Sequence, residues 1–328
     1  MLLAGCVGPP GEVDLPTPPP DQVTSDTTLL QGRPNPYRDP RSPALRWAED
    51  HRDDPRSAVI AARMKGSWPP ATWLDGSSVA QVERVLREAA AVDAMPFLVS
   101  DALPGPRCDA RDRSRGGGPA AYAAWTEDLA GAIGGSAAVV VLEPGSIALA
   151  GCLTDEQRAG RTAMLTAAVE TLASSGATVL VDAGPGDGGE ATGVARRLSD
   201  LLRDGVVGLA FGVGTYQETG ALEEYAEQVR TALGSEAERL HLVLDVARTV
   251  PRGEDVAPLA CNPSAGKVSP GSQVLGDTGY VKRLWIMAPG LSDGECGGAS
   301  GVPRGAFDPD LAVTALDLDV SQRGSSEG

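Results

Sequence analysis

Five carboxylates stand directly after apolar stretches of the sequence, in places where a buried strand would end. Asp101, Glu143, Asp182 and Asp245 each close one such stretch, and Asp293 follows the last one. The ends of parallel strands meet at one face of a fold, and carboxylates brought together there can act as general acid and general base. The pattern predicts an acidic cleft. The alternative is that each Asp caps the helix that follows it, a role that Asp fills well.

One of these carboxylates is followed by a residue that offers no chemistry. The stretch VVVLEPGSIAL runs from 139 to 149, and its aliphatic residues are typical of a buried parallel strand that leads to Glu143. Gly145 comes two positions later, in a loop of the kind where the site residues of α/β folds gather. The question is whether a catalytic acid belongs at this position.

Alternating strands and helices must position these residues. The expected strands cover 71–74, 96–100, 137–143, 177–182, 206–213, 240–245 and 281–287. The expected helices cover 79–92, 119–133, 155–174, 189–202 and 218–233, with Thr154 as the N-cap of the third. Strands that alternate with helices indicate a parallel sheet, so we expect an α/β fold, either a barrel or a doubly wound sheet.

The overall charge excludes one class of partner. The 328 residues include 28 Lys and Arg against 44 Asp and Glu, a net charge of −16, whereas nucleic acid requires a basic face. An acidic, solvated surface of this kind is common in high-GC bacteria. Aromatic residues make up only 4% of the chain, which is few for a sugar-binding cleft lined by stacking Trp and Tyr.

The cysteines indicate an oxidising compartment. Their number is odd, and they stand at Cys6, Cys108, Cys152, Cys261 and Cys296. The last four fit two disulfides, for which the sequence alone allows three pairings. No two cysteines have the spacing of a zinc site, and the chain contains only two His, each more typical of a surface or packing position. We therefore expect neither a metal nor another cofactor.

The N-terminal residues explain the fifth cysteine. Residues 1–6 end in LAGC, which resembles a bacterial lipobox whose cysteine, here Cys6, is lipidated; a chance occurrence of LAGC is the alternative. Residues 7–33 include the Pro-rich stretch GPPGEVDLPTPPPD, typical of a tether that does not pack. We expect an extracytoplasmic protein, held at the cell membrane by a lipid anchor or secreted, from a high-GC Gram-positive bacterium.

Several short segments occur in an order that identifies a family. They are NPYRDP at 35–40, ATWL at 71–74, VLEP at 141–144, VDAG at 181–184, CNP at 261–263 and WIMAPGLSDGEC at 285–296. In this order, with four cysteines in register, the chain resembles glycoside hydrolase family 6, the inverting cellulases and cellobiohydrolases. The resemblance implies a distorted seven-stranded parallel α/β barrel, TIM-like, over 34–312, and the disulfides Cys108–Cys152 and Cys261–Cys296. We expect a flexible tail at 313–328.

The resemblance also answers the question of the catalytic acid. Inverting hydrolysis needs an acid on one side of the glycosidic bond and a base-activated water on the other. The resemblance places the general acid at Gly145, an assisting Asp at Arg107 and the base at Asp293. Asp101 stands where the family has a Tyr. Gly145 cannot donate a proton, and Arg107 reverses a charge within the site.

Three further positions at which the resemblance implies a site residue hold a different residue type in this sequence. Pro185 replaces a His, and Met287 and Leu291 replace a Lys and a Glu that bind sugar hydroxyls. Asp182 is retained as a catalytic-site carboxylate.

The retained positions with an implied role in substrate binding are Trp285, Glu143 and Asn262. Packing and hydrogen bonding within the barrel would explain Glu143, Asp182 and Trp285 equally well.

Three hypotheses follow. The first is a glucanase-related surface lipoprotein with impaired catalysis, which binds a glycan or serves as a scaffold. The second is an active inverting glycosidase on a β-glucan or other glycan, with a relocated acid at Asp101, Asp109, Asp112 or Asp187. The third is a purely structural envelope protein without a ligand.

Overall fold

The computed structural model describes residues 35–106, 108, 117–148, 150–186, 191–202, 205–250, 262, 281–295, 301–316, 318 and 320. Several sequence predictions fall outside the described residues. They concern the lipobox with Cys6, the tether at 7–33, Arg107, Asp109, Asp112, Asp187, the Cys261–Cys296 disulfide and most of the tail at 313–328.

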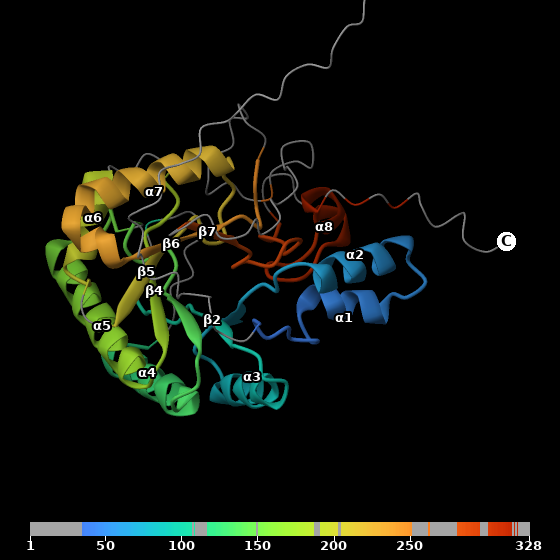
Figure 1. Cartoon of the computed structure of the whole chain (residues 1–328), viewed down its shortest axis with the longest axis horizontal. Helices are drawn as coiled ribbons and strands as arrows, with labels where there is room; N and C mark the ends of the chain where they lie inside the picture. The colour runs from blue at the N-terminus through green and yellow to red at the C-terminus, as the bar shows by residue number, and fades with distance from the viewer. Residues whose placement is uncertain are drawn as a thin grey trace, which may run out of the picture.

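Seven parallel strands form one sheet in chain order, as expected. They are β1 (Thr72–Leu74), β2 (Phe97–Ser100), β3 (Val139–Leu142), β4 (Thr178–Asp182), β5 (Val206–Phe211), β6 (His241–Asp245) and β7 (Val281–Leu284). The sheet curls so that its two edges approach each other, and the Ala71 N–H donates to the Ile286 carbonyl at 3.2 Å, just outside β1 and β7 (Figure 1). The expected distorted parallel barrel is confirmed as a curled, incomplete barrel.

Helices cover the outer face of this sheet (Figure 1). The five expected ones are α3 (Val79–Ala91), α4 (Pro119–Ile133), α5 (Asp155–Ser174), α6 (Ala191–Ser199) and α7 (Thr219–Leu233). Helix α5 begins with a capping box, because the Thr154 hydroxyl accepts from the Gln157 N–H while the Gln157 side chain accepts from the Thr154 N–H. In the described residues, no helix combines the length and the apolar character needed to cross a membrane.

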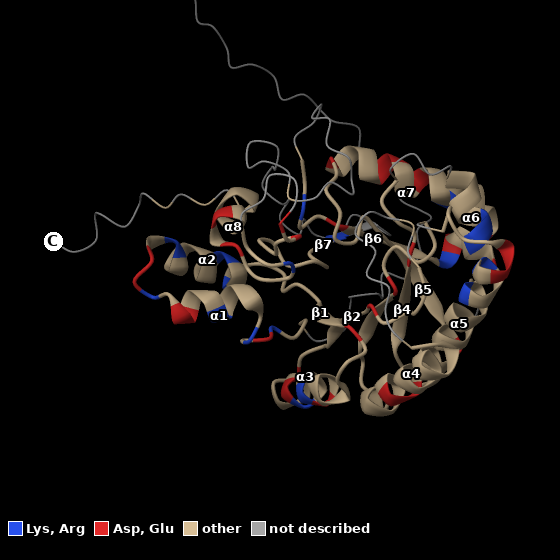
Figure 2. Ribbon diagram, turned by 180° about the vertical axis from the view of Figure 1, so that it is seen from behind, with Lys and Arg blue, Asp and Glu red and all other residues tan. Residues whose placement is uncertain are grey.

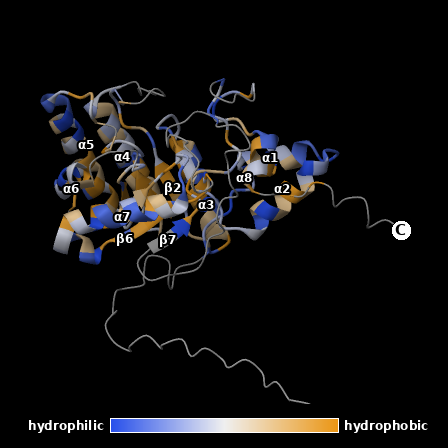
Figure 3. Cartoon of the chain, turned by 90° about the horizontal axis from the view of Figure 1, so that it is seen from above, coloured by the Kyte–Doolittle hydropathy of each residue, from blue (hydrophilic) through white to orange (hydrophobic). Residues whose placement is uncertain are grey.

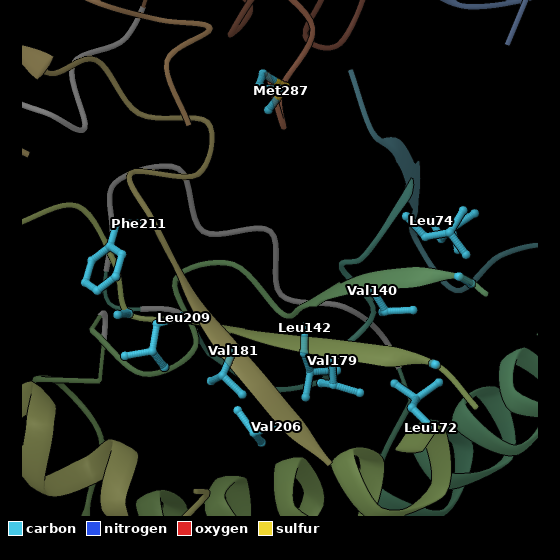
Figure 4. Packing of buried hydrophobic residues seen from close by; sticks show 14 of the residues in the cluster. Leu74, Val140, Leu142, Leu172, Val179, Val181, Val206, Leu209, Phe211 and Met287 are labelled. Atoms are coloured by element: carbon cyan, nitrogen blue, oxygen red, sulfur yellow. The ribbon is translucent and has the colours of Figure 1, made fainter. Parts of the chain in front are cut away.

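Strand residues alternate between two cores. Val140, Leu142 and Val179 point toward the helices and pack with Leu172 of α5 (Figure 4). The intervening residues, including Val99, Val141 and Leu180, fill the inside of the barrel. This period of two is the geometry of a strand buried on both faces, and it makes the barrel a packed core rather than a pore. Hydrophobic strands and more polar outer helices are also apparent from above (Figure 3).

A terminal helix group lies beside the open edge of the barrel (Figure 1). It consists of α1 (Pro43–Asp50), α2 (Pro55–Gly66) and α8 (Pro309–Ala315), none of which the sequence analysis expected; a short 3-10 helix at Gly234–Arg239 was also missed. Each of the three helices starts with Pro at its first turn, where a missing N–H costs nothing. Arg56 of α2 pairs with Asp54 and Asp310, which ties α2 to α8. Helix α8 continues three residues past the expected domain end at 312.

Candidate active site

Glu143 joins two strand ends. It follows β3, has a positive φ of 47° and is fully buried. Its carboxylate accepts hydrogen bonds from the Ser100 hydroxyl at 2.7 Å and from the N–H groups of Ala102 and Leu103, both at 2.9 Å. These contacts fix the chain that leaves β2. The arrangement favours a structural role for Glu143 over contact with a substrate.

Gly145 contacts Asp182 at the next strand end. The Gly145 N–H donates to Oδ2 of Asp182 at 2.7 Å, and Gly145 has a φ of 79°, in the left-handed region that favours glycine. Asp182 closes β4 and is 1% exposed. A side chain at position 145 would therefore begin within hydrogen-bonding reach of the Asp182 carboxylate. Pro185, three residues beyond Asp182, is buried.

Asp101 lies at the same end of the barrel. It follows β2, is 2% exposed, and its N–H donates to the Leu74 carbonyl at the end of β1 at 2.8 Å. Asp101, Glu143 and Asp182 thus close three consecutive strands, as the sequence predicts. Acidic segments appear among the strands as well as on the outer helices in Figure 2.

Asp293 forms a buried ion pair that the sequence analysis missed. Nη1 of Arg248 lies 2.9 Å from Oδ1 of Asp293, and the Arg248 side chain is 4% exposed. The guanidinium also donates to the Gly214 carbonyl at 3.2 Å and to the Leu291 carbonyl at 2.6 Å, and it lies 4.9 Å from the centre of the Tyr216 ring. No local sequence motif predicts this ion pair, because its two residues are 45 positions apart in the sequence.

Charge and burial act in opposite directions on Arg248. Burial works to lower the pKa of its guanidinium, but Tyr216, Asp293 and Asp245 outweigh burial, so the pKa is raised above its ordinary value. Arg248 therefore stays cationic and holds the Asp293 carboxylate in the ion pair.

Asn262 completes the surroundings of Asp293. The Asp293 N–H donates to Oδ1 of Asn262 at 2.8 Å, and the Asn262 N–H donates to Oδ2 of Asp293 at 3.3 Å. The structure thus brings Asn262 and Asp293 together, and Asn262 is 4% exposed. Its contacts fit the positioning of Asp293 better than direct contact with a substrate.

Asp245 serves as an anchor for three segments. Its carboxylate accepts hydrogen bonds from the N–H groups of Gly214, Ala247, Ile286 and Met287, at 2.9 to 3.1 Å. Complete burial raises the pKa of Asp245, and the four donors oppose that rise. Asp245 therefore joins the ends of β6 and β7 to the loop that follows β5.

A cavity of about 460 Å³ opens between the terminal helix group and the open edge of the barrel. Asp293, Met287 and Leu291 line it, together with the partly exposed indole of Trp73. The indole N–H of Trp73 donates to the Ile286 carbonyl at 3.2 Å, which fixes the ring. The sequence analysis used Trp73 only as part of the expected strand 71–74 and did not consider its indole as a ring-binding surface.

Trp285 does not line this cavity. It is 0% exposed, it belongs to the main hydrophobic core, and its indole nitrogen has no hydrogen-bond partner. In this conformation Trp285 offers no surface to a sugar ring, so the structure favours the packing interpretation. In the part of the chain that the structure describes, no three His, Cys, Asp or Glu residues gather closely enough to hold a metal ion.

The Cys108–Cys152 disulfide is confirmed, with the two Cα atoms 5.4 Å apart. It connects the chain that leaves β2 to the segment before α5. The bridge therefore holds together the loops that follow β2 and β3, which carry Asp101, Glu143 and Gly145.

Comparisons with known proteins identify a family that the chain matches. Residues 33–309 match the family described as Glycosyl hydrolases family 6. Endoglucanase 1 of Streptomyces halstedii is 32% identical over 305 residues, which cover 91% of this chain and 92% of that protein. Endoglucanase A of Cellulomonas fimi is 30% identical over 269 residues, covering 80% and 57% of the two chains.

Solved structures show the same fold. The endoglucanase Cel6 of Mycobacterium tuberculosis, solved in complex with a thio-linked methyl cellobiosyl cellobioside, superposes with a TM-score of 0.74 at 27% identity and covers 88% of this chain and 98% of its own. The family 6 enzyme of Orpinomyces sp. Y102 superposes with a TM-score of 0.72 at 19% identity, covering 87% and 96%.

Proposed function

The chain belongs to glycosyl hydrolases family 6, and from this premise we propose that it binds a glucan chain but hydrolyses it weakly or not at all. The observation that carries this proposal is that Gly145, which the sequence resemblance places at the position of the general acid, meets Asp182 through its backbone N–H alone. Removal of a general acid costs about 10²–10⁴-fold in rate.

The general base of an inverting mechanism is better supported than the general acid. Asp293, which the sequence resemblance places at the position of the base, is held by an ion pair with the buried Arg248. A base without an acid can activate water, but the leaving oxygen then departs unprotonated. Arg107, Met287 and Leu291 remove further contacts that the family makes with the acid, the water or the sugar hydroxyls, and such contacts count most in the transition state.

An active enzyme with a relocated acid is the second candidate, favoured by a different observation. Asp101 is 2% exposed and closes the strand next to the one that leads to Gly145. Asp101 is therefore a carboxyl group at the same end of the barrel as Gly145. The relatives, 30–34% identical, carry the name endoglucanase.

We also propose that the protein works outside the cytoplasm, held at the membrane by a lipid on Cys6 and the tether at 7–33. The Cys108–Cys152 disulfide supports an oxidising compartment. Expression with and without Cys6→Ser in a bacterium that lipidates proteins tests the anchor. The unmodified protein should remain in the membrane fraction and the variant should appear in the medium; equal distribution would overturn the anchor.

Two assays on the same preparations test the function. The first measures reducing-sugar release from soluble β-glucan and carboxymethylcellulose by the unmodified protein, Asp293→Ala, Asp101→Asn and Gly145→Asp/Arg107→Asp. The second measures retardation in native gels that contain the same glucans. We expect retardation without release from the unmodified protein, and a gain of release from the restored double variant.

Other outcomes separate the candidates. Release that Asp293→Ala and Asp101→Asn both abolish would replace the non-catalytic proposal with the relocated acid. Absence of both release and retardation would remove the glucan as a ligand and leave a structural role in the envelope.

A further inference from the structure

The cavity beside the open edge of the barrel is rich in arginine, although the whole chain carries a net charge of −16. We call it the arginine cavity. Its lining includes two carboxylates, Asp39 and Asp293, and six arginines: Arg38, Arg41, Arg46, Arg84, Arg248 and Arg304. The local charge thus has the opposite sign to that of the protein. A cavity with low-dielectric walls and one sign of charge concentrates ligands of the other sign.

Three of the six arginines are already neutralised by carboxylates. Arg248 pairs with Asp293. Arg84 pairs with Asp39 at 2.8 Å and with Glu88 at 3.1 Å, and Arg41 also pairs with Glu88. These pairs stiffen the wall of the cavity but leave little charge for a ligand.

The other three arginines have no carboxylate partner among the described residues. Arg38 is partly buried and donates to the carbonyls of Met64 and Ser67. Burial lowers the pKa of its guanidinium, and no carboxylate among the described residues offsets this effect. Arg46 on α1 and Arg304 before α8 are exposed and form no ion pair in the described part of the chain. They come from two different segments that border the same cavity.

The remaining lining combines apolar side chains with a few uncharged polar ones. Trp73 presents a fixed aromatic face, whereas Met287 and Leu291 are apolar side chains that form no hydrogen bonds to hydroxyls. A neutral sugar would gain ring contact with Trp73, and its hydroxyl groups could meet only the few uncharged polar side chains of the lining, Ser42, Thr72, Gln81 and Ser292. A volume of about 460 Å³ falls within the range of small-ligand sites, roughly 300–1,000 Å³.

We propose that the arginine cavity binds a sugar that carries an anionic group, a carboxylate or a phosphate, through Arg46, Arg304 and Arg38. Guanidinium groups bind both anions through paired N–H donors, and Trp73 supplies the ring contact. The inference rests on the proposed glycan-binding function and names the chemistry of a ligand for the cavity that Asp293 lines. Charge then supplies affinity that the apolar lining residues Met287 and Leu291 do not.

Calorimetric titration of the full chain tests this inference. The ligands are a β-1,4-linked tetramer of glucuronic acid, neutral cellotetraose and glucose 6-phosphate. We expect the uronate tetramer to bind at least tenfold more tightly than cellotetraose, with an affinity that falls as NaCl is raised. Tighter binding of glucose 6-phosphate than of the uronate would support the same anion site and identify phosphate as the source.

Matched variants locate the site. Arg46→Gln/Arg304→Gln removes two exposed charges and should weaken uronate binding about tenfold or more. Arg87→Gln removes an exposed charge from α3, which also borders the cavity, but Arg87 does not line it, so binding should be unchanged. Thermal melting of each variant checks that the fold is intact, and both substitutions are at the surface.

Each remaining outcome decides the question. Cellotetraose binding that equals or exceeds uronate binding would overturn the inference and leave the proposed glucan binding in place. Absence of binding by all three ligands would overturn both. Preferential uronate binding that survives in Arg46→Gln/Arg304→Gln, or that falls equally in Arg87→Gln, would show that the arginine cavity is not the site.

Discussion

The N–H of Gly145 donates to Oδ2 of Asp182 at 2.7 Å, and the φ of Gly145, 79°, is one that few residues other than glycine adopt. The backbone thus makes the contact between the loop after β3 and the end of β4. This relationship restricts what can replace Gly145 and makes the position open to experiment.

The effect of a Gly145 substitution on the free energy of unfolding should depend on how readily the new residue adopts a left-handed backbone conformation. Gly145→Ala should lower the free energy of unfolding by about 1–2 kcal/mol, because a Cβ is strained in this region. Gly145→Asp should cost less, since Asp visits the left-handed region more readily, unless its charge opposes Asp182. Urea denaturation checks both. A smaller loss for Ala than for Asp at low pH, where both carboxyls are protonated, would contradict the backbone argument.

Substitution of Arg248 should lower the free energy of unfolding more than most single substitutions do. Arg248→Met leaves Asp293 buried without its cation, and breaking one partner of a buried pair costs about 3–5 kcal/mol. The double variant Arg248→Met/Asp293→Leu should recover much of that loss, because no uncompensated charge remains. Denaturation of the two variants gives the comparison. Equal losses would mean that Arg248 acts through Tyr216 and the Gly214 and Leu291 carbonyls instead.

The sequence predicts the barrel because its strands are easy to recognise from their residue pattern. Each is a short, continuous apolar run, which is what burial on both faces requires, and the runs alternate with longer amphipathic segments. The errors are at the ends: the runs 206–213 and 281–287 continue past the strands that end at 211 and 284. Apolar residues there remain buried after the ladder stops, so hydrophobicity alone does not mark the end of a strand.

The terminal helix group had a sequence signal that hydrophobic periodicity does not detect. A polar N-cap precedes Pro at the start of each helix, in Ser42-Pro43, Asp54-Pro55 and Asp308-Pro309. The Arg248–Asp293 pair had no such signal, because it forms only when distant strand ends meet. Strand position predicts that carboxylates gather at the site, but it does not predict the cation that one of them faces.

The Cys108–Cys152 disulfide should contribute substantially to stability. The bridge closes a segment with a sequence separation of 44, for which the chain-entropy relation gives about 4 kcal/mol. Cys108→Ser/Cys152→Ser should therefore unfold at a lower urea concentration than the unmodified protein. Reduction of the unmodified protein with dithiothreitol should produce a similar shift. An unchanged midpoint in both cases would mean that hydrogen bonds of Glu143 and Arg161, rather than the bridge, hold the loops after β2 and β3.

Glu143 should matter for stability through its acceptor atoms rather than its acidity. Glu143→Gln replaces one oxygen with an NH₂ group that faces N–H or O–H donors from Ser100, Ala102 and Leu103. Leaving a buried donor unsatisfied costs about 1–3 kcal/mol. Glu127→Gln, at an exposed position of α4, is the matched control and should change the unfolding free energy little. Equal effects of the two substitutions would exclude the anchoring role.

The Asp54–Arg56 contact predicts a specific pH dependence. Side-chain hydrogen bonds from Arg56 lower the pKa of Asp54 from 3.8 to about 2 in the folded protein. A lowered folded-state pKa means that the unfolded chain binds the proton first, so this stability is fully present above the unfolded pKa and is lost as pH falls through the folded pKa. The difference in unfolding free energy between the unmodified protein and Asp54→Asn should therefore be constant near neutral pH and shrink between about pH 4 and pH 2. Asn still caps α2, so the comparison isolates the charge. In an Arg56→Met background the same substitution should lose most of this pH dependence; if the dependence persists there, its source is another carboxylate.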